Sequence, residues 1–193
     1  MNQQAVEPVS RFSAEEKAIL KQVARNAIQY GLQYHGYQPI EIEKYPPTLR
    51  EAGACFVTLK KSGQLRGCIG SLEPHRALVA DVAHNAYAAA FSDHRFPPLA
   101  VQELAEVELD ISVLSAAEPI SFTSETDLLQ QIRPGIDGLI LEEGMHRGTF
   151  LPSVWESLPD AESFLRHLKQ KAGLPPDYWS PSIKILRYTS ESF

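Results

Sequence analysis

The chain has 193 residues, of which 44% are hydrophobic and 22% are charged, a composition typical of a globular protein with one large domain or two lobes that share a core. Its 18 basic and 24 acidic side chains give a formal net charge of −6, which does not support general binding of nucleic acid or of an anionic membrane. No apolar run of about 18 residues occurs and no signal peptide is visible, so we expect no membrane span. Two cysteines in this context predict a cytoplasmic protein with free thiols.

The first predicted element is a helix over residues 13–34. Ser13 and Glu16 have the spacing of a capping box, in which each side chain accepts a hydrogen bond from the backbone of the other residue. Apolar residues follow at helical spacing: Ile19, Leu20, Val23, Ala24, Ala27 and Ile28. We expect Gly36 to end this helix and Tyr45-Pro46-Pro47 to form a loop, because proline donates no backbone hydrogen bond.

A β-hairpin is predicted next, from two β-prone segments over residues 54–59 and 65–72. The five residues between them contain Ser62-Gly63, which is a turn signal. With Ser62-Gly63 at the centre of the turn, Val57 pairs with Cys68.

This register places Cys55 on the face of Cys68, diagonally displaced, whereas a five-residue loop sends Cys55 to the other face. Neither register allows an unstrained disulfide between the two residues, so both thiols are expected to be free.

A second helix is predicted after Pro74 and should end before Pro97-Pro98. Its alanines allow another backbone to approach closely. Alternating apolar and polar residues over 107–113 then predict a half-buried antiparallel strand. Further along, we expect helices over 124–133 and from Asp160 to Gly173, and strands over 138–142, 149–151 and 183–188. This mixture of helices and mostly antiparallel strands predicts an α+β fold.

The most informative segment is Leu65–Gly70. In a regular strand Arg66 and Cys68 point to one face, about 7 Å apart at their Cα atoms. A guanidinium at this distance stabilises a thiolate, which makes Cys68 a candidate catalytic nucleophile and Arg66 its candidate activator. Gly67 and Gly70 leave room for a ligand or another backbone, so both are candidate substrate-binding positions. The alternative is a buried structural cysteine in a tightly packed hairpin.

Further polar residues are candidates for the same site. Asp93 and Arg95 are candidates for binding a polar substrate group, with Arg95 taking a carboxylate or phosphate. Alternatively, they form an ion pair at a helix end and orient the turn at Phe96-Pro97-Pro98. Three histidines are candidate bases for the thiol, although surface or capping roles are commoner for each: His75, His84 and His94.

No metal site and no cofactor are predicted. The chain has no Cys-x-x-Cys, no His-Glu-x-x-His, no acidic calcium loop, no dinucleotide fingerprint and no phosphate-binding loop. A local nucleic-acid surface would need Lys60, Lys61 and Arg66 to join Lys184 and Arg187, with Tyr188 as a stacking surface. The alternative is ordinary solvated charge, with lysines protecting an edge strand.

Leu65-Arg66-Gly67-Cys68-Ile69-Gly70 resembles the signature of the AMMECR domain family, whose prokaryotic members are called AmmeMemoRadiSam system protein A. Other segments also resemble the family: Cys55–Thr58, Asp93–Pro98, Ser112–Leu114, Thr149–Pro152, Lys171–Gly173 and Ile183–Tyr188. The resemblance divides the chain into an N-terminal extension over 1–12 and an AMMECR-type domain over 13–193. It implies a two-lobed domain with a mostly antiparallel sheet, flanking helices and a cleft between the lobes.

The resemblance implies no named reaction. It suggests a role in RNA modification, and the prokaryotic name implies a Memo-like protein and a radical S-adenosylmethionine protein as partners. This chain lacks the cysteine triad of a radical S-adenosylmethionine cluster, so that chemistry would belong to the partner. The leading hypothesis is an accessory thiol-dependent enzyme or group carrier centred on Cys68. The alternatives are a noncatalytic binding or delivery module and a protein of RNA modification.

Overall fold

The computed structural model describes residues 10–193, which form two compact units. The first unit contains the chain up to Leu114 together with Glu191–Phe193, and the second contains Ser115–Ser190. Residues 1–9 of the expected N-terminal extension lie outside the described residues. Phe12, at the end of that extension, is buried in the core of the first unit.

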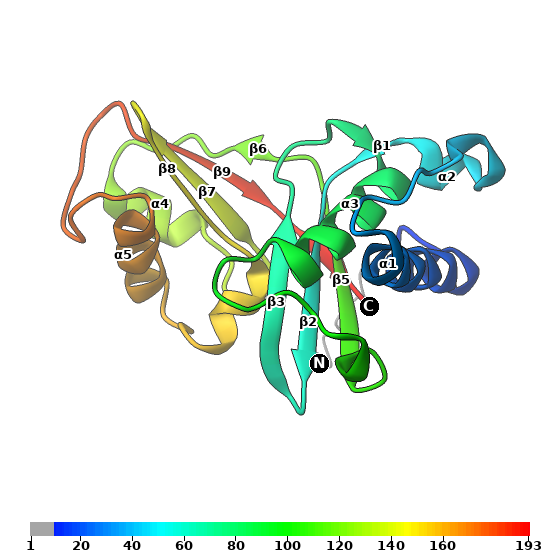
Figure 1. The fold of residues 1–193 in the computed structure, drawn as a ribbon. Helices are drawn as coiled ribbons and strands as arrows, with labels where there is room; N and C mark the ends of the chain where they lie inside the picture. Colours follow the sequence, from blue (N-terminus) through cyan, green and yellow to red (C-terminus); the bar gives the residue numbers. More distant parts are fainter. Residues whose placement is uncertain (1–9) are drawn as a thin grey trace, which may run out of the picture. The chain divides into compact units, whose positions relative to one another are not determined.

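A four-stranded sheet with the order β10-β5-β2-β3 forms the centre of the first unit (Figure 1). Its strands are β2 (Cys55–Lys61), β3 (Gln64–Gly70), β5 (Val107–Leu114) and β10 (Ser190–Ser192). The β2 strand is antiparallel to both β3 and β5, and β3 is an edge strand. A separate two-stranded ladder joins β1 (Ala52–Gly53) to β4 (Arg76–Ala77).

Helices α1 (Ala14–Tyr34) and α3 (Leu78–Phe91) pack against each other, and α3 also packs on β2 and β3. Figure 1 shows the two helices side by side. The buried stripe of α3 and the buried residues Val57 and Leu59 of β2 form one hydrophobic core. Shorter helical segments are α2 (Pro47–Arg50), η1 (Ile42–Lys44) and η2 (Val101–Glu103).

The capping box predicted for α1 is confirmed, since Ser13 and Glu16 bond each other's backbone. The helix ends at Tyr34, as predicted, but the left-handed residue that ends it is His35, with φ 54°, rather than Gly36. The predicted loop at Tyr45–Pro47 is wrong at its last residue: Pro47 starts α2, where its missing N–H costs no helical hydrogen bond. Similarly, α3 starts at Leu78 rather than near Pro74.

The predicted hairpin is confirmed, but its register is wrong by one residue. Ser62 and Gly63 have φ 52° and 74°, which fits a tight turn with two left-handed residues. A bulge shifts the register between Leu59 and Lys60, so that Thr58 rather than Val57 lies opposite Cys68. Cys55 therefore lies on the buried face of the sheet and Cys68 on the opposite face, and both are free thiols.

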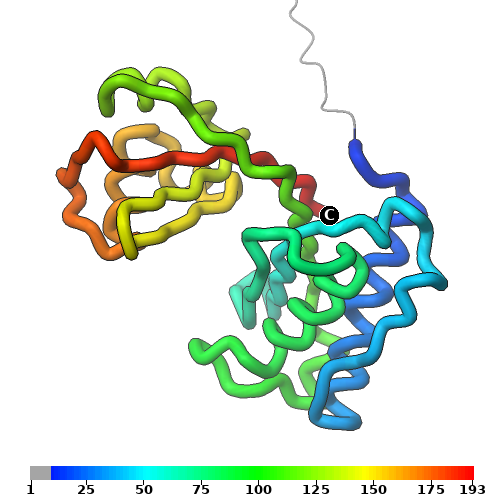
Figure 2. The backbone as a smooth tube through the Cα atoms, turned by 90° about the horizontal axis from the view of Figure 1, so that it is seen from above, coloured from blue at the N-terminus to red at the C-terminus, as the bar shows by residue number. Residues whose placement is uncertain are grey.

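The second unit contains an antiparallel sheet with the order β6-β9-β7-β8. Its strands are β6 (Glu118–Pro119), β7 (Gly138–Glu143), β8 (His146–Phe150) and β9 (Lys184–Tyr188). The helical segments of this unit are α4 (Glu125–Gln131), η3 (Pro152–Glu156) and α5 (Ala161–Lys171). Figure 2 shows the path of the backbone through these segments. Helix α5 packs against β8. The aromatic core is centred on Phe164, which stacks on Trp155 at 3.8 Å between ring centroids.

The α+β fold predicted from the sequence is confirmed, with helices packed on antiparallel sheets. The predicted strand over 149–151 begins earlier, at His146, and four very short strands, β1, β4, β6 and β10, were not predicted. None of the helices in residues 10–193 is long and apolar enough to cross a bilayer.

Candidate functional site

Cys68 lies in the middle of β3, at an open edge of the first unit's sheet. Its side chain is partly exposed, and its Sγ lies 3.3 Å from the Thr58 hydroxyl oxygen. The bulge creates this contact, because it brings Thr58 directly opposite Cys68. The thiol therefore has a neighbouring hydroxyl that can donate a hydrogen bond to its ionised form.

The backbone of Cys68 is held by side chains instead of by another strand. Its N–H donates to Asp93 Oδ2 at 2.9 Å, and its carbonyl accepts a hydrogen bond from Arg95 Nη2 at 3.3 Å. A neighbouring strand would satisfy the same two groups. The Asp93–Arg95 pair thus closes the edge of β3 at the thiol and fixes the backbone that carries it.

Asp93 and Arg95 also bind each other tightly. Arg95 donates from Nε and Nη2 to the two carboxylate oxygens of Asp93, at 2.9 and 2.7 Å. These hydrogen bonds hold the pKa of Asp93 far below its usual value, and the Cys68 N–H lowers it further, although burial opposes the shift. The Asp93 side chain is 5% exposed, whereas that of Arg95 is 57% exposed, so Arg95 presents part of its guanidinium to solvent.

The loop after α3 owes its shape to the same pair. The Phe96 N–H donates to the Asp93 carbonyl at 3.0 Å, and the Arg95 guanidinium lies 5.5 Å from the Phe96 ring centroid. The ion pair that orients this turn, expected as one alternative, is present. The same pair also contacts the backbone of Cys68, and the other interpretation, that Asp93 and Arg95 bind a polar substrate group, stays a prediction.

Arg66 binds Glu103, although its guanidinium and that of Arg95 lie 6.0 and 5.5 Å from the centroid of the same Phe96 ring. Arg66 Nε and Nη2 donate to the carboxylate of Glu103 at 3.0 and 2.9 Å, and Lys61 binds the same carboxylate. By alternation along β2, Lys61 points to the same face of the sheet as the buried Val57 and Leu59. Because Arg66 binds the same carboxylate as Lys61, it also reaches toward that face. The expected common face of Arg66 and Cys68 is wrong, because the bulge at this end of β3 breaks the alternation.

The Arg66–Glu103 pair is nonetheless a strong local interaction. Hydrogen bonds from Arg66 are the largest cause that lowers the pKa of Glu103 from 4.5 to about 2. The remaining guanidinium nitrogen, Arg66 Nη1, is buried and has no hydrogen-bond partner among residues 10–193. Arg66 therefore fastens η2 to the hairpin.

The protein itself fills the space beside both glycines of the segment. A Cβ on Gly67 would lie 2.1 Å from the carbonyl oxygen of Ala89, so this glycine lets β3 approach the backbone of α3. A Cβ on Gly70 would lie 2.2 Å from the ring of Phe56. These contacts explain both glycines by packing, and the suggested substrate-binding role of Gly67 and Gly70 stays a prediction.

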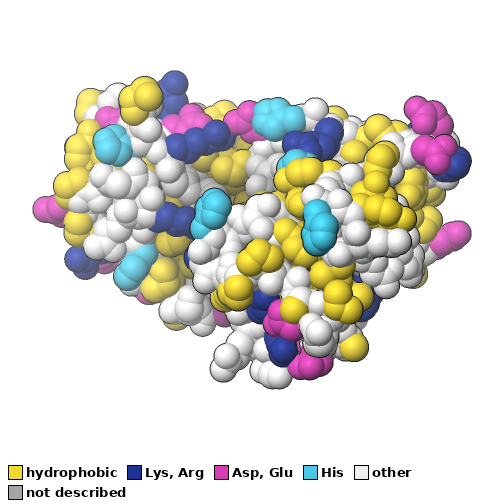
Figure 3. All heavy atoms as spheres, in the orientation of Figure 1, with side chains coloured by type: hydrophobic (Ala, Val, Ile, Leu, Met, Phe, Trp, Pro, Cys, Tyr) yellow, Lys and Arg dark blue, Asp and Glu magenta, His cyan; other side chains and the backbone are white. Residues whose placement is uncertain are grey.

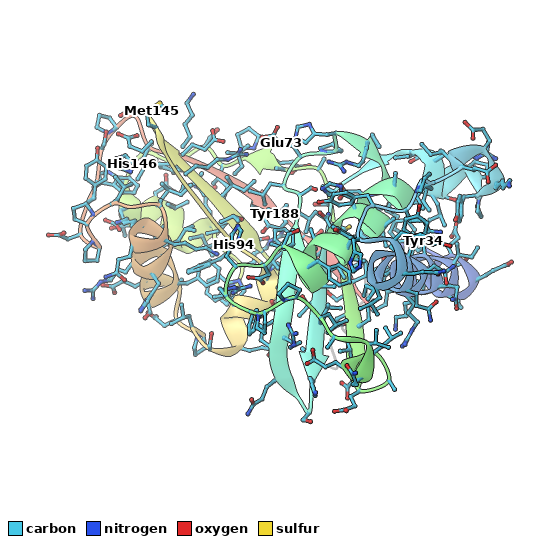
Figure 4. All side chains as sticks on the ribbon, viewed as in Figure 1. Tyr34, Glu73, His94, Met145, His146 and Tyr188 are labelled. Atoms are coloured by element: carbon cyan, nitrogen blue, oxygen red, sulfur yellow. The ribbon has the colours of Figure 1, made fainter. Side chains whose placement is uncertain are left out.

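None of the three candidate bases has a hydrogen bond to Cys68 in the described chain. His75 lies 3.6 Å from Glu73, and His84 stacks on Tyr37 with ring centroids 4.4 Å apart. Burial is the main cause that lowers the pKa of His84. His94 is exposed on the loop after α3, where Figure 4 labels it.

A buried polar cluster around Cys55 was not predicted. Asp81 is fully buried and accepts hydrogen bonds from Ser71, from Asn85 and from the backbone N–H of Cys55. Burial, followed by the negative charge of Asp81, raises the pKa of the Cys55 thiol well above its usual value. The sequence signal was the interruption of an apolar helix by Asp81 and Asn85, four residues apart.

Acidic side chains neutralise the basic residues of the hairpin. Lys60 lies 3.6 Å from Asp110, and Lys61 lies 3.3 Å from Glu106 as well as binding Glu103. Figure 3 shows acidic and basic side chains intermixed at this end of the first unit. The hairpin therefore offers no local basic patch. No group of three or more metal-binding side chains occurs within the described part of the chain.

Comparison with known proteins shows which family and which proteins this chain is similar to. The family model described as AMMECR1 matches residues 21–193. A protein of Methanothermobacter thermautotrophicus is 39% identical over 189 residues, covering 94% of this chain and 95% of its own. A protein of Methanocaldococcus jannaschii is 37% identical over 190 residues, covering 94% and 91%.

A solved structure is also similar. The crystal structure of an uncharacterised protein from Pyrococcus horikoshii superposes with a TM-score of 0.87 at 34% identity. The match covers 95% of this chain and 93% of that one. The names of these relatives give no activity.

Proposed function

This chain belongs to the AMMECR1 family, and we propose that it is an accessory thiol-dependent enzyme whose reacting group is the Cys68 sulfur. The observation that carries the proposal is the support built around one partly exposed thiol. Asp93 and Arg95 hold its backbone, and the Thr58 hydroxyl lies 3.3 Å from its sulfur. The Thr58 hydroxyl is the contact among these that reaches the sulfur, and a cysteine that only filled space would not need it.

In this proposal Arg95 takes the activating role first considered for Arg66. The pKa of Arg95 is raised, mainly by its hydrogen bonds to Asp93 and to a smaller extent by the charges of Asp93 and Cys68. Arg66 is instead occupied by Glu103. Arg95 Nη2 binds the Cys68 carbonyl oxygen, and in this proposal the positive charge that it brings to Cys68 favours the thiolate, which is the nucleophilic form.

Arg95 also favours a substrate with an anionic group. Two of its guanidinium nitrogens bind Asp93, while the side chain remains largely exposed. The free side of the guanidinium can take a carboxylate or phosphate oxygen, a pairing that suits its planar geometry. We therefore propose an electrophilic substrate whose anionic group lies beside the carbon that Cys68 attacks.

The partners of this activity follow from the family resemblance and are part of the proposal. A Memo-like protein and a radical S-adenosylmethionine protein would act with this chain in the cytoplasm, and the chain would need no cofactor of its own. A role in RNA modification is the less favoured candidate, because the hairpin lysines are paired with acidic side chains.

The experiment compares two alkylating agents that differ in charge. Iodoacetate and iodoacetamide both form a bond between sulfur and carbon and release iodide, but only iodoacetate carries a carboxylate. We expect the ratio of their rates at Cys68, assigned by peptide mass mapping, to exceed the ratio for free N-acetylcysteine. The ratio should fall to the free-thiol value in Arg95→Gln and stay high in Arg66→Gln.

A different result distinguishes the alternatives. A ratio equal to that of N-acetylcysteine in the wild-type protein would refute an anion-binding thiol site. Complete protection of Cys68 from both reagents would refute thiol chemistry and favour a noncatalytic binding or delivery module.

A further inference from the structure

One row of side chains crosses the first unit's sheet at Cys68. Thr58 lies opposite Cys68 in the β2–β3 pair and opposite Asp110 in the β2–β5 pair. Side chains that lie opposite each other in antiparallel strands point to the same face of the sheet. All three therefore lie on the face opposite to the buried residues Val57 and Leu59, which we call the outer face. Helix α3 packs on the other face.

This row is accessible along its length. Cys68 and Thr58 are partly exposed, and the Asp110 side chain is 46% exposed. Neighbouring strands lie about 4.8 Å apart, so the Cα atoms of Cys68 and Asp110 are about 10 Å apart. Arg95 lies on the other side of Cys68, at the open edge of β3. A molecule that reacts with the thiol therefore meets a guanidinium toward the edge of the sheet and a carboxylate toward its centre.

The outer face carries a negative charge that its own lysine does not balance. Lys60 lies 3.6 Å from Asp110 and opposite Glu108 in the strand register. By alternation along β2 and β5, these three are the charged side chains of that face on the two strands, so one ammonium group faces two carboxylates. The Lys60 and Asp110 side chains are 44% and 46% exposed, and ion pairs this exposed are weak. Asp110 is therefore open to a second cation.

We propose that the substrate of the Cys68 thiol is zwitterionic, with its anionic group at Arg95 and an ammonium group at Asp110. This inference rests on the proposed function and names the substrate class of that site. Opposite charges on the two sides of the sulfur fix the direction in which the molecule lies across the sheet. The electrophilic carbon between the two charged groups is then held at the thiol.

The experiment measures the rates at which three methanethiosulfonates modify Cys68 in the full-length protein, with the site assigned by peptide mass mapping. Each reagent forms a disulfide with the thiolate and releases methanesulfinate, and the transferred group is trimethylammonioethyl, sulfonatoethyl or uncharged methyl. Each charged reagent's rate is divided by the methyl rate, and then by the same ratio for N-acetylcysteine. All three reagents meet the same thiolate fraction at one pH, so these normalised ratios do not depend on the pKa of Cys68.

The two charged reagents report on the two ends of the site separately. We expect the wild-type cation and anion ratios to be about three, the effect of one exposed opposite charge. Asp110→Asn should lower the cation ratio to one without lowering the anion ratio, and Arg95→Gln should lower only the anion ratio. Glu106→Gln is the matched control, because it removes a carboxylate whose partner Lys61 points to the other face, and it should keep both ratios.

The results also separate this inference from the proposed function. A wild-type cation ratio of one, or an equal fall in Asp110→Asn and Glu106→Gln, would overturn the ammonium site and leave the reactive thiol standing. A Cys68 that reacts with none of the three reagents would refute the proposed function, and this inference with it.

Discussion

The replacement Gly67→Ala tests whether β3 lies as close to α3 as the structure indicates. The added methyl carbon would lie 2.1 Å from the Ala89 carbonyl oxygen and 3.1 Å from the Ala89 carbonyl carbon. Both atoms belong to the backbone of α3, so they cannot move away by a change of rotamer. The clash of the added methyl group with Ala89 can be relieved only if β3 and α3 move apart.

The expected cost follows from this geometry. Overpacking a well-packed core costs about 1–3 kcal/mol, and a clash with helix backbone belongs at the upper end, so we expect a loss of about 3 kcal/mol. With a urea m-value of about 2 kcal/mol/M, the midpoint of unfolding falls by about 1.5 M.

Far-UV circular dichroism is the appropriate probe, because both tryptophans, Trp155 and Trp179, lie in the second unit and report on that unit only. Gly36→Ala is the matched control: its nearest neighbour would be the Tyr34 carbonyl oxygen at 3.9 Å, an ordinary contact. We expect the control to change stability by less than about 0.5 kcal/mol. Equal midpoints for Gly67→Ala and the wild type would refute the close approach of β3 to α3.

Three further predictions concern the thiols and Glu103. Iodoacetamide should modify one thiol in the native protein and a second only after unfolding, because burial raises the pKa of Cys55; early modification of Cys55 in a peptide map would contradict this. Thr58→Val should slow the alkylation of Cys68 several-fold and Thr58→Ser should preserve it, since only the hydroxyl can donate to the thiolate; equal rates in all three proteins would remove Thr58 from the site. Folding lowers the pKa of Glu103 from 4.5 to about 2, so its ionised form stabilises the protein above pH 4.5 and this contribution is lost as the pH falls toward 2. After allowance for solvent screening, unfolding experiments against pH should show a loss on the order of 2 kcal/mol that is absent in Glu103→Gln; the same pH dependence in both proteins would show that another group titrates.

Local signals predicted much of the fold. The capping box of Ser13 and Glu16 specified the start of α1, and the Ser62-Gly63 turn specified the hairpin, because both depend on residues close in sequence. The α4 and α5 caps, Ser124 and Asp160, belong to the same class. Elements with a strong local pattern could therefore be recognised without tertiary information.

The register of the hairpin could not be predicted in the same way. The bulge has no distinct sequence pattern, yet it moves the partner of Cys68 from Val57 to Thr58 and turns Arg66 toward Glu103. A shift of one residue reverses which face each side chain occupies. The expected pairing of Arg66 with the thiol failed for this reason.

The surroundings of Cys68 depend on contacts that are distant in sequence. Asp93 and Arg95 were recognised as candidates, but nothing in the sequence indicated that they bind the backbone of Cys68, which lies 25 and 27 positions earlier. The two cysteines also differ in a way that their neighbours do not indicate, since Cys55 lies in the buried cluster of Asp81. Such contacts follow from the packing of α3 and its following loop against β3.

The central claim is that Cys68 is a reactive thiol supported by Arg95. It is tested most directly by the rate at which iodoacetamide alkylates Cys68 at neutral pH in the wild type, Arg95→Gln and Arg66→Gln. The account predicts that the wild type reacts faster than N-acetylcysteine, that Arg95→Gln reacts about tenfold more slowly than the wild type, and that Arg66→Gln keeps the wild-type rate. A wild-type rate no faster than that of N-acetylcysteine, or a loss in Arg66→Gln alone, would contradict it.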